Sequence, residues 1–146
     1  MESGISIKVI RGPDEDQLFI YQIILSNGSA SASLDFWGNS NSFKDFAKEL
    51  IDFPKTNQDT VTYQLGNDSS DEQPNSAYYL LLKAFCIDAA GHTAIKVVVD
   101  NYQEGSDYQR SQFYIKSEPN SLNQLGKKLE AWDPTNVKEL SWSAIS

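Results

Sequence analysis

The sequence predicts an α+β fold in which a largely antiparallel β-sheet of roughly six to eight strands carries two α-helices packed on one face. Three observations lead to this prediction. Most of the chain consists of short segments in which apolar and polar residues alternate, with turn-forming residues between them. Two longer segments have apolar residues at helical spacing instead. No regular strand–helix–strand alternation runs through the chain, so a doubly wound parallel sheet is disfavoured.

The strands are predicted from alternation and from the turns that separate them. Asn27-Gly28 is a hairpin signal, because both residues tolerate a positive φ. The segment 77–88 is apolar on both faces apart from Lys83, which indicates a central strand covered at least in part on both sides. The tail, 135–146, is expected to add a short strand or to pack as a strap. The other predicted strands are 5–10, 18–25, 29–37, 60–65, 93–102 and 108–116.

Two helices are predicted, at 41–53 and 120–132, each ended by a proline at or just after its last turn. In both, the apolar residues fall on one stripe, as expected for a helix that covers a sheet. A Ser with a polar partner three residues later resembles a capping box in each helix, as Ser42 with Asp45 and as Ser121 with Gln124. The stripe residues are Phe43, Phe46, Ala47, Leu50 and Ile51, then Leu122, Leu125, Leu129 and Trp132.

The two helix segments resemble each other at an offset of 79 positions. Asn41-Ser42-Phe43 corresponds to Asn120-Ser121-Leu122, and Phe46-Ala47-Lys48 corresponds to Leu125-Gly126-Lys127. A strand precedes each helix at the same offset. The pattern predicts an internal duplication of a strand–strand–helix unit, in which two copies share one core. The alternative is that amphipathic helices resemble one another without common origin.

Length and charge bound the class of protein. The 146 residues fit a single domain, 1–146, large enough to fold without a metal or a disulfide. The net charge is −8, and residues 1–76 carry −7 of it, with five basic against twelve acidic side chains. Such a surface repels phosphate backbones, so we expect no nucleic-acid partner, whereas a basic protein would be attracted. The alternative is that the acidity only keeps the protein in solution.

The compartment is predicted from what the sequence lacks. The chain has a single cysteine, so no internal disulfide forms, which favours a reducing compartment. The start, Met-Glu-Ser-Gly, lacks the basic and apolar parts of a secretory signal. No apolar run is long enough to span a membrane. We therefore expect a cytoplasmic protein with no membrane partner; its oligomeric state stays open.

The residues that carry chemistry give no candidate catalytic set. His92, the sole histidine, follows Gly91 in a predicted turn, where a solvated side chain is the simpler interpretation. Cys86 lies between Phe85 and Ile87 and is interpreted as a buried small hydrophobe. One histidine and one cysteine cannot build a zinc site, and the spacing of a calcium loop is lacking. We expect no catalytic residue, no metal and no cofactor.

A partner-binding surface is the remaining candidate site. Asp68, Asp71 and Glu72 lie in an acidic loop that a basic partner would recognise, although a solvated loop explains them as well. Trp37 and Tyr78 belong to a large set of aromatic residues, and Trp and Tyr are favoured anchors at protein interfaces. Core or edge packing explains most of that set equally well. We predict these five residues as partner-binding.

The layout of the chain also resembles a known family. The segment Gly91-His92-Thr93 that opens the strand up to Val99, then Phe113-Tyr114-Ile115 and the helix from Leu122 to Leu129, is similar to the WapI-like immunity proteins of bacterial polymorphic toxin systems and to related uncharacterised domains. The similarity covers about residues 30–132, including the strand and helix within 31–53. That family often has Asp-Gln before the last helix, where this chain has Glu118-Pro119-Asn120. The resemblance implies a cytoplasmic antitoxin that binds and blocks a toxin domain, and it implies no catalytic residue.

Two further hypotheses stay open beside a non-enzymatic protein-binding module. A small-ligand carrier or a carboxylate-based enzyme would need a deep pocket lined by Asp35 or Asp88 with a raised pKa. A structural domain of a larger assembly would show an exposed apolar face.

Overall fold

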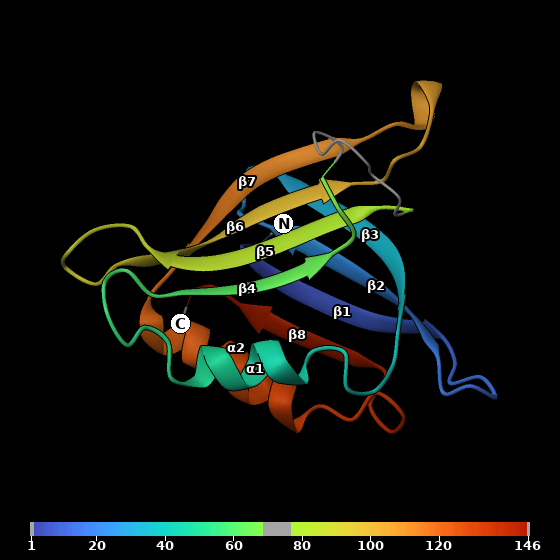
Figure 1. Ribbon diagram of the computed structural model, residues 1–146, viewed down its shortest axis with the longest axis horizontal. Coiled ribbons are helices and arrows are strands. Elements are labelled where there is room, and N and C mark those ends of the chain that lie inside the picture. The colour runs from blue at the N-terminus through green and yellow to red at the C-terminus, as the bar shows by residue number, and fades with distance from the viewer. Residues whose placement is uncertain (1, 69–76, 146) are drawn as a thin grey trace.

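The computed structural model describes residues 2–68 and 77–145, and in these ranges the chain forms eight strands, two α-helices and one 3₁₀ turn (Figure 1). In chain order they are β1 (Gly4–Arg11), β2 (Phe19–Ser26), β3 (Ser31–Gly38), α1 (Lys44–Ile51), β4 (Thr60–Leu65), β5 (Tyr79–Cys86), β6 (Thr93–Asp100), the 3₁₀ turn η1 (Gly105–Asp107), β7 (Arg110–Ser117), α2 (Pro119–Ala131) and β8 (Glu139–Ser143).

The strands form two antiparallel sheets of four strands each. The first sheet has the order β3-β2-β1-β8 and the second has the order β4-β5-β6-β7. The alternation of each strand buries one set of side chains, and the inner sets of both sheets share one core with the helices. Ile7, Ile23 and Phe36 represent the first sheet in this core, and Leu80 and Ile95 represent the second. The fold is therefore two sheets around a common apolar interior.

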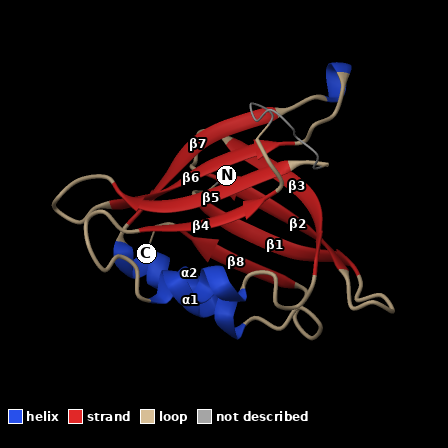
Figure 2. Ribbon diagram, in the orientation of Figure 1, coloured by secondary structure: helices blue, strands red, loops and turns tan. Residues whose placement is uncertain are grey.

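The α+β class with antiparallel strands is confirmed, and the tail does add a strand, β8. The prediction of one sheet missed the division into two, because alternation shows which face of a strand is buried but not which strand it pairs with. Both helices lie side by side on one side of the molecule, as predicted, with α1 against β4 and α2 against β8 (Figure 2).

The helices pack closely because Gly126 of α2 has no side chain. A Cβ there would lie 2.8 Å from the carbonyl oxygen of Ala47 in α1. Each helix also donates hydrogen bonds to the last carbonyl groups of the other helix. Lys44 Nζ of α1 donates to the carbonyls of Glu130 and Trp132 at 2.7 and 2.9 Å. Asn123 Nδ2 of α2 donates in the same way to the carbonyls of Leu50 and Phe53 at the end of α1.

The predicted capping boxes are wrong. Ser42 Oγ accepts a hydrogen bond from Asn39 N–H at 2.8 Å, and helix α1 begins two residues later without a side-chain cap. Helix α2 begins at Pro119, so Ser121 lies inside the helix and cannot be its N-cap; its side chain is buried. Proline suits the first position of a helix, since the amide hydrogen it lacks has no partner there.

The internal echo corresponds to a repeat in the architecture. Strands β1, β2 and β3 precede α1, just as β5, β6 and β7 precede α2, and one more strand follows each helix. The strand after each helix joins the other half: β4 pairs with β5, and β8 pairs with β1. The two sheets thus have equivalent strand orders, related by exchange of their last strands. This arrangement supports the predicted duplication and extends its unit to three strands, a helix and a strand.

Candidate functional site

A cleft of about 520 Å³ lies between the open edge of β3 and the connection from β6 to β7. Amide and aromatic side chains make up much of its lining, and Asp35 is the one acidic residue among those that line it. Ala77 and Tyr78, which precede β5, close one side. The lining residues are Gln22, Ser33, Leu34, Asp35, Trp37, Ala77, Tyr78, Asn101, Gln103 and Gln109.

Trp37 and Tyr78, both predicted as partner-binding, meet in this cleft. In β3 the alternate residues Leu34 and Phe36 face the core, so Trp37 faces outward and is 56% exposed. The backbone N–H of Trp37 donates to the hydroxyl of Tyr78 at 3.3 Å. Because β3 is an edge strand, this bond occupies one of its outward-facing backbone donors and leaves the indole ring at the mouth of the cleft.

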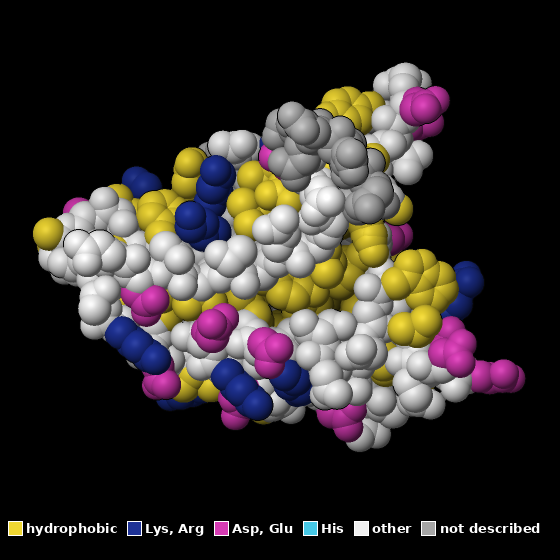
Figure 3. Space-filling view, viewed as in Figure 1, with side chains coloured by type: hydrophobic (Ala, Val, Ile, Leu, Met, Phe, Trp, Pro, Cys, Tyr) yellow, Lys and Arg dark blue, Asp and Glu magenta, His cyan; other side chains and the backbone are white. Residues whose placement is uncertain are grey.

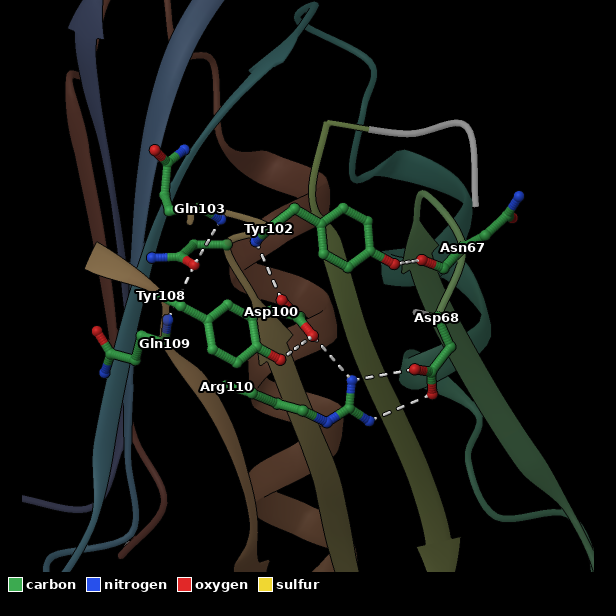
Figure 4. A network of polar contacts seen from close by, with 9 residues as sticks. Asn67, Asp68, Asp100, Tyr102, Gln103, Tyr108, Gln109 and Arg110 are labelled. Carbon is green, nitrogen blue, oxygen red and sulfur yellow. Dashed lines mark hydrogen bonds and ion pairs between the residues drawn. The ribbon is translucent and has the colours of Figure 1, made fainter. Parts of the chain in front are cut away.

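A buried carboxylate holds the opposite wall of the cleft. Asp100, at the end of β6, is fully buried and accepts hydrogen bonds from the backbone N–H of Tyr102 and the hydroxyl of Tyr108, each at 3.0 Å (Figure 4). Arg110 Nη1 pairs with it at 3.1 Å. The bond to Asp100 raises the pKa of Tyr108 above its ordinary value. These contacts fix both ends of the loop that carries η1.

Asn101 orders the same loop from within. Its side-chain oxygen accepts the N–H groups of Gln103 and Gln109 at 3.1 and 3.0 Å, and its amide nitrogen donates to the carbonyl of Asp107. The side chains of Gln103 and Gln109 line the cleft. This wall was not among the features predicted from the sequence. The sequence did contain a sign of it: an acidic residue, Asp100, ends the apolar strand β6, and two amide residues, Asn101 and Gln103, follow within three positions.

Of the three acidic residues predicted as partner-binding, only Asp68 lies within the described residues. Asp68 forms a two-pronged ion pair with Arg110, at 3.0 and 3.3 Å, so its charge is compensated within the molecule (Figure 4). The bond to Asp68 is the main reason that the pKa of Arg110 lies above its ordinary value. Asp71 and Glu72 lie outside the described residues. The cleft therefore brings together Trp37 and Tyr78, while Asp68 takes part in the network behind it.

His92 and Asp88 form an exposed pair, with Nδ1 of the histidine 2.8 Å from a carboxylate oxygen. This hydrogen bond raises the pKa of His92 and lowers the pKa of Asp88. The other carboxylate oxygen accepts the N–H groups of Ala90 and His92, so Asp88 also holds the turn between β5 and β6. The raised carboxylate pKa that would favour acid–base chemistry at Asp88 is therefore not observed.

Cys86 is half-buried against the core, and burial is the main cause of the raised pKa of its thiol. A raised pKa disfavours the reactive thiolate form. Within residues 2–68 and 77–145, no three His, Cys, Asp or Glu side chains gather in a way that could hold a metal ion. The helices of these two ranges include none that is long and apolar enough to cross a membrane.

Comparison with known proteins finds similarity at the level of structure. The structure of the plant transcriptional regulator PBF-2 matches with 10% sequence identity and a TM-score of 0.45, over 88% of this chain and 75% of that one. The crystal structure of WHY3 from Arabidopsis thaliana matches with 9% identity and a TM-score of 0.44, over 86% and 76%. No protein-family model and no curated protein matches the chain.

We withdraw the expectation that the protein has no nucleic-acid partner, since one of the similar structures is that of a plant transcriptional regulator. That expectation was based on the net charge of −8, which is a sum over the whole chain, whereas a ligand meets one face. The strands of the second sheet carry four basic residues and one acidic residue, Asp100, which is buried. Net charge does not describe such a face.

Proposed function

We propose that this protein is a non-enzymatic protein-binding module of the cytoplasm that holds its partner in the cleft beside β3. The observation that carries the proposal is the exposed Trp37 at the mouth of a cleft of about 520 Å³. Tryptophan supplies a large contact area and ranks among the commonest residues that dominate binding energy. The lining is richer in amides than the mostly apolar lining of a small-molecule pocket, which favours a polypeptide partner.

The open edge of β3 suggests how a polypeptide would dock. Edge strands present unpaired backbone groups, and an extended segment can add to them as a further strand. The amide side chains of Gln22, Gln103 and Gln109 can each donate to and accept from a peptide backbone. We expect main-chain hydrogen bonds to supply the register and Trp37 to anchor the segment.

The partner that we propose is a bacterial toxin domain. The resemblance to WapI-like immunity proteins motivates this choice, and the net charge of −8 would steer a basic toxin toward the molecule. Inhibition would be steric, because an immunity protein needs only to cover the toxin's working surface.

The test is rescue of growth. We expect a toxin domain to be encoded beside the gene. That domain is expressed in a heterologous bacterium with and without this protein, and rescue is expected for the native chain. Trp37→Ala should weaken toxin binding at least tenfold in calorimetry and abolish rescue, since a central anchor of this kind contributes about 2 kcal/mol or more.

The matched control is Val137→Ala, which removes another exposed apolar side chain (54% exposed) that lies outside the cleft. It should rescue like the native protein. Failure of the native chain to bind or neutralise the neighbouring toxin domain, or equal loss in both variants, would count against the proposal.

A further inference from the structure

The outer face of the second sheet carries two lysines directly opposite each other. Lys83 of β5 pairs in register with Lys96 of β6, and both point away from the core because Leu82 and Ile95 beside them point inward. Figure 3 shows basic side chains gathered over this sheet with hydrophobic side chains on both sides. Opposed like charges on adjacent strands destabilise a sheet. In the described part of the chain, neither ammonium group has an ion-pair partner.

The internal repeat provides a comparison for this face. Lys83, Lys96 and Tyr114 are the fifth, fourth and fifth residues of β5, β6 and β7, and they form one row across the sheet with Thr62. The same positions of β1, β2 and β3 form the equivalent row of the first sheet. That row consists of Lys8, Gln22 and Asp35, with Glu139 of β8 at its end. The first sheet thus balances one lysine with two carboxylates, whereas the second sheet leaves two lysines beside a tyrosine.

Aromatic rings flank the lysine pair. Phe85 and Tyr114 meet edge to face, with ring centroids 5.9 Å apart, across the small side chain of Ala94 on the strand between them. Tyr114 is 45% exposed. The four residues Lys83, Phe85, Lys96 and Tyr114 line a groove of about 410 Å³.

One acidic residue, Asp59, lines the groove, against the two lysines Lys83 and Lys96. Its carboxylate accepts the backbone N–H of Lys55 at 3.0 Å, within the turn that leads into β4. A third lysine, Lys116, is exposed two residues beyond Tyr114 on the same face of β7. The face as a whole is therefore cationic and aromatic on a molecule that is acidic overall.

We infer that this face, the Lys83–Lys96 groove with Phe85 and Tyr114, binds single-stranded nucleic acid. Lysines attract the phosphates, and exposed aromatic rings on a sheet provide a surface on which unpaired bases stack. The combination favours a nucleic acid over an acidic polypeptide, because carboxylates would use the lysines but have no base to stack on the rings. A duplex would use the lysines alone, since its bases are already stacked on one another.

The site is separate from the cleft beside β3, because none of the residues that line the groove lines that cleft. The inference goes beyond the proposed protein-binding function. Failure of either one leaves the other to be judged on its own experiment.

The experiment is fluorescence anisotropy of labelled (dT)15 with the full chain in low salt. The native protein should bind, with an affinity that falls as salt is added. Lys83→Gln combined with Lys96→Gln should weaken binding at least tenfold and reduce the salt slope by about 1.4, since each phosphate contact on a single strand contributes about 0.7. Tyr114→Ala should weaken binding about fivefold or more, and Tyr114→Trp should retain it.

The matched control is Lys8→Gln combined with Lys127→Gln, which changes the net charge equally at exposed lysines outside the groove. It should leave binding within about twofold of the native affinity, because a change outside the site acts only through long-range fields that salt screens. The Lys83/Lys96 variant should unfold at no lower temperature than the native chain, because it removes a like-charge pair.

Three outcomes would overturn the inference. The first is no binding of (dT)15 at several hundred micromolar protein. The second is equal loss in the groove and control variants. The third is binding of a (dT)15·(dA)15 duplex, or competition by poly-glutamate, as strong as that of the single strand.

Discussion

Tyr21 and Tyr63 are buried tyrosines whose rings both contact Phe43, and they differ in one hydrogen bond. The hydroxyl of Tyr21 donates to the carbonyl of Asn39 at 2.8 Å. The hydroxyl of Tyr63 has no hydrogen-bond partner among the described residues. Burial raises the pKa of both phenols. A buried hydroxyl without a partner costs free energy that an apolar group of the same shape does not.

We therefore expect opposite effects from the same substitution. Tyr63→Phe should raise the free energy of unfolding by about 1 kcal/mol, because it removes an unsatisfied hydroxyl. Tyr21→Phe should lower it by about 1 kcal/mol, because the Asn39 carbonyl loses its donor. Urea denaturation of both variants measures the two changes. A Tyr63→Phe variant that is less stable than the native chain would show that the hydroxyl has a partner in solution.

At the scale of elements, the two helices depend on each other for their ends. The last carbonyls of a helix lack partners within it. Lys44 supplies three donors to the end of α2, at 3.3, 2.7 and 2.9 Å from the carbonyls of Leu129, Glu130 and Trp132. Its positive charge also suits the negative end of the helix dipole. Asn123 lies 79 positions after Lys44, the offset of the repeat, and donates to the last carbonyls of α1. Equivalent positions of the two helices thus satisfy each other's carboxyl ends.

Replacement of Lys44 by methionine keeps the length of the side chain and removes its donors. Lys44→Met should lower the free energy of unfolding by about 2 kcal/mol, the usual range for hydrogen bonds to a charged group. Lys48→Met, one turn along the same helix at an exposed position, should change it by less than about 0.5 kcal/mol. Thermal and chemical denaturation provide the comparison. Equal losses in the two variants would mean that the bonds at Lys44 contribute no net stability.

At the scale of the whole molecule, the exchange of last strands joins the two halves. Strand β4 belongs to the first half by sequence and to the second sheet by pairing, and β8 is the reverse case. Neither half can therefore complete a four-stranded sheet alone. The core is also common to both halves, since α1 and α2 pack on each other and on residues of both sheets.

Fragments 1–68 and 77–146 should each lack cooperative structure when alone, because each has lost the strand that its sheet borrows from the other. An equimolar mixture should recover native circular dichroism and a single unfolding transition. Dispersed amide signals in the nuclear magnetic resonance spectrum of 1–68 alone would contradict this expectation.

Local patterns were sufficient to predict much of the fold and part of the site. Alternation predicted the strands, because side chains on a strand face opposite sides by geometry alone. The same rule applies to Trp37, which follows the core residue Phe36 and is exposed, although its orientation was not among the predictions. Helical spacing predicted both helices and their buried stripes. These features depend on neighbours within a few residues, and the sequence lists those neighbours directly.

Only the tertiary structure decided which distant segments meet. Strand β8 lies against β1 across almost the whole chain, and Asp100 becomes a buried anchor because Arg110 is its cross-strand neighbour. The lysine pair has the same origin, since Lys83 and Lys96 face each other only through the register of β5 and β6. Pairing and register are set by the packing of the common core, which no local pattern contains. For that reason the composition shows only that the chain is acidic, whereas the folded structure brings lysines together on one face.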